Sequence, residues 1–228
     1  MKILLTLAIL LTAFTFQAQA QHEYAPIQQQ EIKYKNWNYK SVRDDKTVDL
    51  REFARNKKLV MVVYFAQWCP NWKLEAPVAQ RFYDKYKQYG FAVVGVSEYD
   101  TVAATRANLD AQKITFPVVS ESDSKDAKQK TAHYEYRRKT GDTRGWGSPW
   151  NIFLEPANLE KNGETLTKNA FVVNGELIES DAEKFIRQKL GLPAEDIKTA
   201  NGTTSEKKVE ACEPDKKSTA FKKPELKK

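Results

Sequence analysis

The sequence contains little cysteine and little histidine, with two residues of each among 228. Cys69 and Cys212 allow at most one internal disulfide bond, so the chain is not a small disulfide-rich scaffold. They also exclude a cysteine-rich zinc site. His22 lies near the start of the chain and His133 in a polar segment, and neither stands at metal-ligand spacing from other ligands. We therefore expect no metal and no cofactor, and we interpret both histidines as surface residues.

Charge of one sign is not concentrated in the body of the chain either. The net charge is +7, the two signs are interspersed, and lysines cluster only in the C-terminal segment. A nucleic-acid-binding face needs clustered basic residues together with an element that reads the nucleic acid. The sequence therefore predicts no nucleic-acid partner. Residues 192–228 have almost no apolar content and are predicted to form a disordered tail rich in lysine and glutamate.

The one long apolar run lies at the N-terminus, where Lys2 precedes Ile3–Phe16 and the small residues Ala18 and Ala20 follow. This pattern predicts a secretory signal peptide over residues 1–20. The run is shorter than the roughly 20 apolar residues that a membrane-spanning helix needs. We therefore expect an exported protein, periplasmic or extracellular, with no membrane span after signal removal.

Residues 38–191 are predicted to form one α/β domain, preceded by a flexible, Gln-rich lead-in over residues 21–37. Leu59–Phe65 and Phe91–Ser97 have the continuous apolar, β-branched composition of buried strands. Between them, apolar residues recur at helical spacing and predict a helix. A strand, a helix and a second strand in this order form a βαβ unit, so the two strands should be parallel. Further predicted elements are a helix over 101–112, a strand over 116–119, a helix over 124–139, a strand over 151–154, a hairpin over 170–178 and a helix over 181–190.

Cys69 is the residue most suited to chemistry, because it lies just after a buried strand and just before a helix. Its sulfur should therefore lie near the positive end of the helix dipole and above unsatisfied backbone N–H groups. That position favours the thiolate and is expected to lower the pKa of the thiol below about 8.5. Trp68 precedes Cys69 and can shield one side of the sulfur.

The segment Tyr64–Pro77, which reads YFAQWCPNWKLEAP, resembles the active-site region of extracytoplasmic thioredoxin-like oxidoreductases of the TlpA and ResA kind, a redoxin group related to AhpC/TSA proteins. Trp68-Cys69-Pro70-Asn71 stands at the family's W-C-x-x motif, and a Glu-x-Pro follows. The resemblance covers about residues 38–191. It implies a thioredoxin-like fold with a central mixed sheet flanked by helices. It also implies a role in redox homeostasis, with protein or small-molecule thiols and disulfides as partners.

The sequence departs from that family at Trp72, which stands where the second motif cysteine is expected. In the family the first cysteine attacks a partner's disulfide and the second resolves the mixed disulfide. Cys69 can still attack a partner's disulfide, whereas no residue in the motif can resolve the mixed disulfide that results. Cys212 is a candidate resolving cysteine, because loop closure costs rise only slowly with chain length. A free or externally paired Cys212 is the alternative.

The resemblance also implies a cis-proline that faces the active cysteine, and Ser148-Pro149 is the best match. An alternative alignment places residues 170–173 in the following strand and leaves no proline at the site. If Pro149 faces Cys69, four tryptophans gather around it and form an exposed aromatic patch: Trp68, Trp72, Trp146 and Trp150. Trp72 itself is either a contact for a partner or a packing residue that fills the space of the lost cysteine.

Two functions follow from these features. The first is a thiol–disulfide oxidoreductase that acts through Cys69 alone, and the second is a redox-inactive domain that binds proteins or peptides through the aromatic surface. A peroxiredoxin would need a threonine and a proline before its cysteine, and Tyr64–Trp68 do not fit that pattern. A papain-like enzyme needs a histidine partner, and neither histidine is suitably placed.

Overall fold

The computed structural model describes residues 22–193. Its strands are β1 (Tyr24–Ala25), β2 (Gln28–Lys35), β3 (Asn38–Ser41), β4 (Thr47–Asp49), β5 (Leu59–Phe65), β6 (Phe91–Ser97), β7 (Val118–Ser120), β8 (Trp150–Leu154), β9 (Thr165–Val173) and β10 (Glu176–Leu177). Its α-helices are α1 (Leu50–Ala54), α2 (Pro70–Tyr86), α3 (Val102–Ala111), α4 (Ala132–Lys139) and α5 (Glu179–Leu190). Short 3₁₀ helices are η1 (Lys87–Tyr89), η2 (Lys125–Lys130) and η3 (Pro156–Asn158).

One mixed sheet of eight strands runs through the domain in the order β2-β9-β8-β5-β6-β7-β3-β4. Strand β5 is central, parallel to β6 on one side and antiparallel to β8 on the other. The predicted strands over 59–65 and 91–97 are confirmed, as is their parallel pairing. The predicted class, α/β with a central mixed sheet flanked by helices, is therefore confirmed.

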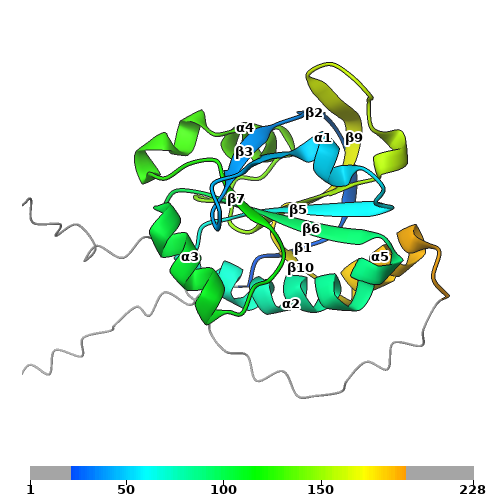
Figure 1. The fold of residues 1–228 in the computed structure, drawn as a ribbon, viewed down its shortest axis with the longest axis horizontal. Helices are drawn as coiled ribbons and strands as arrows, with labels where there is room; N and C mark the ends of the chain where they lie inside the picture. The colour runs from blue at the N-terminus through cyan, green and yellow to red at the C-terminus, as the bar shows by residue number, and fades with distance from the viewer. Residues whose placement is uncertain (1–21, 194–228) are drawn as a thin grey trace, which may run out of the picture.

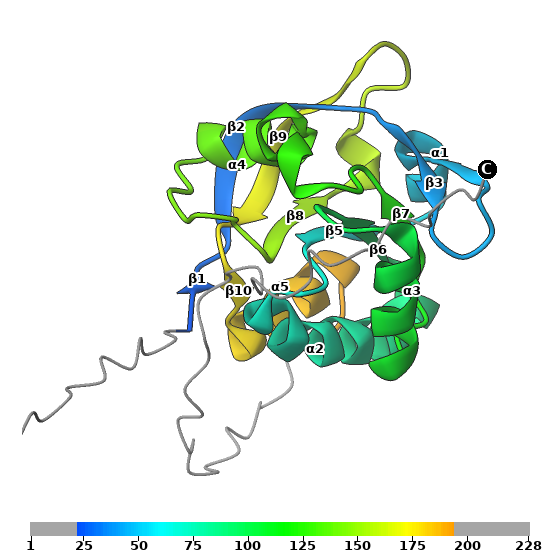
Figure 2. The same cartoon turned by 90° about the vertical axis from the view of Figure 1, so that its left-hand side faces the viewer.

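Helices cover both faces of this sheet, with α2, α3 and α5 on one face and α1 and α4 on the other (Figures 1 and 2). Alternate side chains of β5 pack into the two core layers on opposite faces of the sheet, because successive residues of a strand point to opposite faces. Met61 and Val63 pack in the layer beneath α2, whereas Val62 and Tyr64 pack in the layer beneath α4. Both faces of β5 are thus dry, which explains its uninterrupted apolar sequence.

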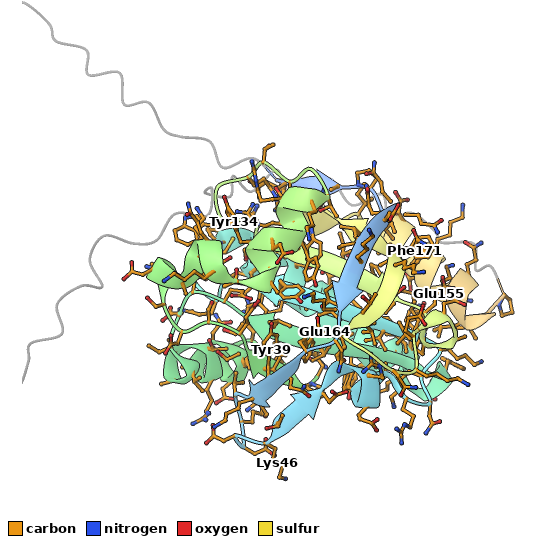
Figure 3. The ribbon with its side chains drawn as sticks, turned by 90° about the horizontal axis from the view of Figure 1, so that it is seen from above. Tyr39, Lys46, Tyr134, Glu155, Glu164 and Phe171 are labelled. Atoms are coloured by element: carbon orange, nitrogen blue, oxygen red, sulfur yellow. The ribbon has the colours of Figure 1, made fainter. Side chains whose placement is uncertain are left out.

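The prediction of a flexible lead-in over residues 21–37 is wrong, because β2 lies within it and pairs with β9 at one edge of the sheet. Ile32 and Tyr34 are buried and alternate with exposed neighbours, which is the pattern of a half-buried strand. The glutamines before them are exposed along the same strand and obscure that alternation in the sequence. Seen from above, β2 lies beside β9, on which Phe171 is labelled (Figure 3).

Two further predictions about local structure are wrong. The helix predicted over 124–139 is divided into η2 and α4, because Thr131 is extended and its hydroxyl caps α4 by accepting the Tyr134 N–H. The hairpin predicted over 170–178 does not form, since β10 pairs in parallel with β1 in a separate sheet. A Cβ on Gly175 would lie 1.9 Å from the carbonyl oxygen of Glu23, so only glycine allows β1 to approach so closely.

The domain extends slightly beyond the predicted boundary at residue 191. Leu192 packs against the core, and its N–H donates to the Arg187 carbonyl. The predicted signal peptide (1–20) and the rest of the predicted tail lie outside the described residues. Within residues 22–193, no helix has the length and apolar content needed to cross a membrane.

Candidate active site around Cys69

Cys69 occupies the position immediately before α2, at the turn that leads from β5 into the helix. Its N–H donates to the Ala66 carbonyl at 2.9 Å, which closes the turn. Pro70 is the first residue of α2, where its missing N–H costs nothing because that group has no partner inside a helix. The sequence thus places the sulfur at the positive end of the helix, as predicted.

The sulfur of Cys69 is fully buried and lies 3.1 Å from the carbonyl oxygen of Ser148. Cys69 is not a free thiol in this structure but is disulfide-bonded. Its reduced thiol, placed in the same geometry, would donate to the Ser148 carbonyl. The candidate resolving residue Cys212 lies outside the described residues.

The loop that faces Cys69 ends at Ser148 and Pro149, just before β8. The Ser148–Pro149 peptide bond is cis, and the residues are fully or almost fully buried, as predicted for a loop that packs on the cysteine. The Ser148 hydroxyl accepts the Ala66 N–H at 2.8 Å. Ser148 therefore contacts both ends of the Cys69 turn, through its hydroxyl and through its carbonyl.

The apolar side of the site consists of Phe65, Trp72 and Ala76, which pack with Cys69 in one core layer. The Trp72 ring stacks on Phe65 with centroids 3.9 Å apart, and its Nε1–H donates to Asn108 Oδ1 at 3.2 Å. Trp72 is fully buried. It therefore acts as a packing residue rather than as a contact for a partner.

The predicted exposed patch of four tryptophans is wrong in two of its members. Trp72 and Trp150 are both fully buried. Trp150 begins strand β8 and packs under α4. Trp68 and Trp146 remain partly exposed, with their rings edge to face at 5.1 Å. The aromatic surface beside Cys69 thus reduces to this one pair.

The polar side of the site consists of Tyr99, His133 and Arg137. His133 is completely buried rather than a surface residue, because it lies on the inner face of α4 and stacks on Tyr64 at 5.3 Å. Its Nε2 lies 3.0 Å from the Gly147 carbonyl, and its Nδ1 lies 2.9 Å from the Tyr99 hydroxyl. A carbonyl only accepts, so Nε2 carries the proton and Nδ1 accepts from Tyr99.

The His133 ring is neutral in this environment. Burial, and then the nearby Arg137 charge, holds the pKa of His133 well below its ordinary value. Arg137 is 1% exposed and donates to the Arg144 carbonyl at 2.8 Å and the Gly145 carbonyl at 3.0 Å. Together the two α4 side chains hold three carbonyls of the loop that carries Ser148.

Gly147 is required in that loop for two reasons. Its φ is +61°, which disfavours a residue with a side chain, and a Cβ there would lie 2.5 Å from Arg137 Cδ. The Arg137 side chain fills the space that a larger residue would need. The loop and α4 are thus fitted to each other.

Glu75 is a buried carboxylic acid on α2. Burial is the main cause that raises the pKa of Glu75 to about 8, although the Leu177 N–H donates to it at 2.7 Å. It lines a cavity of about 170 Å³ together with Tyr24, Leu74 and Leu177. Near neutral pH this group is therefore mostly protonated.

Sequence reasoning did not identify the polar side as part of the site. The signal that was available is the spacing of four residues between His133 and Arg137, which places both on one face of a helix. No local pattern indicates that this face is turned toward the loop before β8, because that contact joins segments through tertiary packing.

Three comparisons place the chain among known proteins. Residues 29–145, just over half of the chain, match the AhpC/TSA family. Over 75 residues the chain is 36% identical to the thiol-disulfide oxidoreductase ResA of Oceanobacillus iheyensis, a match that covers 33% of this chain and 38% of that protein. A secreted thiol-disulfide isomerase from Corynebacterium glutamicum is similar in structure, with 14% identity, a TM-score of 0.50 and coverage of 68% of this chain and 84% of that one.

The ResA match spans well under two thirds of that relative, and the structural likeness, at low identity, shows the fold alone. The family match includes Cys69, α2 and the strands on either side of that helix. From the fold, the site and this match, the chain is a thioredoxin-like member of the AhpC/TSA family.

Proposed function

We propose that this chain is an exported thiol–disulfide oxidoreductase that acts through Cys69. The observation that carries the proposal is the position of Cys69 immediately before the first residue of α2. The helix N-terminus favours the thiolate, which is the nucleophile in thiol–disulfide exchange. Protein or small-molecule disulfides are the proposed substrates.

The proposed reaction is thiol–disulfide exchange, in which each step breaks one disulfide bond and forms another. The Cys69 thiolate attacks one sulfur of the partner's disulfide, which forms a mixed disulfide and releases the other partner sulfur as a thiolate. Because Trp72 occupies the second motif position, a thiol from outside the motif must complete the exchange. Attack of that thiolate on the partner's sulfur returns Cys69 as a thiolate and leaves the partner joined to the new thiol.

The pH dependence of alkylation tests this proposal. In the reduced Cys212→Ser chain, we expect the alkylation rate of Cys69 to rise with a midpoint below the value of about 8.5 for an ordinary thiol. The reduced Cys69→Ser chain, in which Cys212 is the sole thiol, is the matched control and should give an ordinary midpoint. An ordinary or raised midpoint for Cys69 would mean that the thiol is not activated, and the oxidoreductase proposal would be dropped.

The second candidate function is a redox-inactive domain that binds proteins or peptides through Trp68 and Trp146. The observation that favours it is the partial exposure of this edge-to-face pair beside a fully buried cysteine. An ordinary Cys69 midpoint, combined with quenching of tryptophan fluorescence by peptides that lack cysteine, would support it. A Trp146→Ala chain should then lose that quenching.

Export is part of the proposal and rests on the signal pattern in residues 1–20. We expect the secreted form to begin at Gln21. The intact mass of the protein recovered from outside the cytoplasm measures this, and retention of residues 1–20 would contradict it.

A further inference from the structure

A second feature lies beside Cys69, on the surface formed by η2 and the loop before β8. We call Trp68, Trp146, Lys125 and Lys128 the tryptophan–lysine surface. The Lys125 Nζ lies over the Trp68 ring, 5.4 Å from its centroid, and the Lys128 Nζ lies over the Trp146 ring at 4.3 Å. Because the two rings touch, the four side chains form one continuous surface at the residue that precedes Cys69.

Two properties of this surface fit an acidic peptide. Within residues 22–193, neither Lys125 nor Lys128 has a carboxylate within ion-pair distance. Both ammonium groups can therefore pair with carboxylates of a bound peptide. The Trp68 Nε1–H is buried and has no acceptor in the described part of the chain. A buried N–H without a partner is costly, and a peptide carbonyl or carboxylate placed there would satisfy it.

The chain itself contains a segment with the matching chemistry. Glu210–Asp215, which reads EACEPD, holds three acidic residues, no basic residue and the second cysteine of the sequence. Eighteen residues lie between Pro193 and Cys212, which makes 19 steps from one Cα atom to the next. Such a stretch can extend to about 65 Å, which exceeds the diameter of about 40 Å expected for a compact domain of this size.

We propose that the tryptophan–lysine surface binds the chain's own segment Glu210–Asp215 and so delivers Cys212 to Cys69. The proposal rests on the proposed function, in which Cys69 first forms a mixed disulfide with a partner. The Cys212 thiolate then attacks the sulfur of Cys69, the bond to the partner breaks, and the partner leaves as a thiolate. In sum the partner's disulfide is reduced to two thiols and Cys69 and Cys212 are oxidised to one disulfide.

The experiment uses the reduced mature chain and one equivalent of an aromatic disulfide that releases a coloured thiolate. Attack by Cys69 releases one thiolate per reagent molecule, and resolution by Cys212 releases the second from the same molecule. In the Lys125→Glu/Lys128→Glu chain at low salt, we expect the second phase to slow by about tenfold, since two attractive charges become repulsive. The matched control Lys57→Glu/Lys130→Glu, which reverses two exposed lysines outside the surface, should keep the wild-type rate.

A charge swap tests whether the lysines contact the acidic segment directly or change the rate through the overall charge of the protein. Adding Glu210→Lys and Glu213→Lys to the Lys125→Glu/Lys128→Glu chain should restore the second phase. An unchanged second phase in Lys125→Glu/Lys128→Glu would overturn the proposed surface. A fast first phase with no second phase in the wild-type chain would also overturn it, and would leave the proposed function standing with an external resolving thiol. The proposed function itself fails if the Cys212→Ser chain shows no first phase.

Discussion

On the apolar side of Cys69, Phe65 and Trp72 stack at 3.9 Å, and a single hydrogen bond from Trp72 to Asn108 fixes the indole. On the polar side, His133 and Arg137 hold three loop carbonyls by hydrogen bonds of 2.8–3.0 Å. The apolar side thus contributes mainly packing, whose cost on removal grows with the volume lost. The polar side contributes geometry, because each hydrogen bond fixes a backbone carbonyl of the loop that carries Ser148.

The difference separates stability from reactivity. Removing a buried ring from the apolar side should chiefly lower the free energy of unfolding. Removing a donor from the polar side should chiefly change where the Ser148 carbonyl lies relative to Cys69. Two substitutions test this division, one on each side, and a third at Glu75 tests how far the dry interior extends along α2.

Trp72→Ala should have the largest effect. Truncating a fully buried tryptophan leaves a cavity beside Phe65, and we expect a loss of about 3–5 kcal/mol in the free energy of unfolding. Urea denaturation under reducing conditions measures this loss. Trp68→Ala is the matched control, because the same residue type is removed from a partly exposed position, and its loss should be clearly smaller. Equal losses would show that Trp72 is not the packing centre of the apolar side.

The apolar side was largely predictable from the sequence, whereas the polar side was not. The run Leu59–Phe65 and the helical spacing after Cys69 depend on local periodicity, which a sequence displays directly. His133 was interpreted as a surface residue because α4 is polar overall, and its burial depends on contacts with Gly147 and Tyr99 across the fold. Strand β2 was missed for a related reason, since its pairing with β9 brings together segments far apart in the chain.

Glu75→Gln should have the next largest effect, and its size should depend on pH. The pKa of Glu75 is raised to about 8 in the folded protein, so between pH 4.5 and 8 the folded state binds a proton that the unfolded state has released. The wild-type free energy of unfolding should therefore fall as the pH rises through this window, by an amount on the order of a few kcal/mol. Glutamine removes the titration, and the Glu75→Gln chain should lose that part of the decline.

Urea denaturation at several pH values between 4.5 and 8.5 measures this slope. Glu31→Gln, which removes an exposed carboxylate on β2, is the matched control and should keep the wild-type slope. If the Glu75→Gln and wild-type chains decline in parallel, then Glu75 ionises in the folded protein at an ordinary pH. The dry apolar side would then not extend to this residue.

His133→Leu should have the smallest effect on stability and the clearest effect on reactivity. It leaves the Gly147 carbonyl without its donor, at a cost of about 1–3 kcal/mol. The carbonyl dipole of Ser148 opposes a thiolate at 3.1 Å, so a loosened loop should stabilise the thiolate. In the Cys212→Ser background, we expect the pH midpoint of Cys69 alkylation to fall by about half a unit, which corresponds to about 0.7 kcal/mol.

His133→Gln is the control that keeps the contacts, because its amide can donate to Gly147 and accept from Tyr99. It should keep the wild-type alkylation midpoint even if it unfolds more readily than the wild type. A residue that only supports the fold would lower stability in both variants and shift the midpoint in neither. That outcome would mean that the polar side, like the apolar side, contributes only stability. A midpoint that moves in His133→Leu alone would show that α4 sets the pKa of Cys69 through the position of the Ser148 carbonyl.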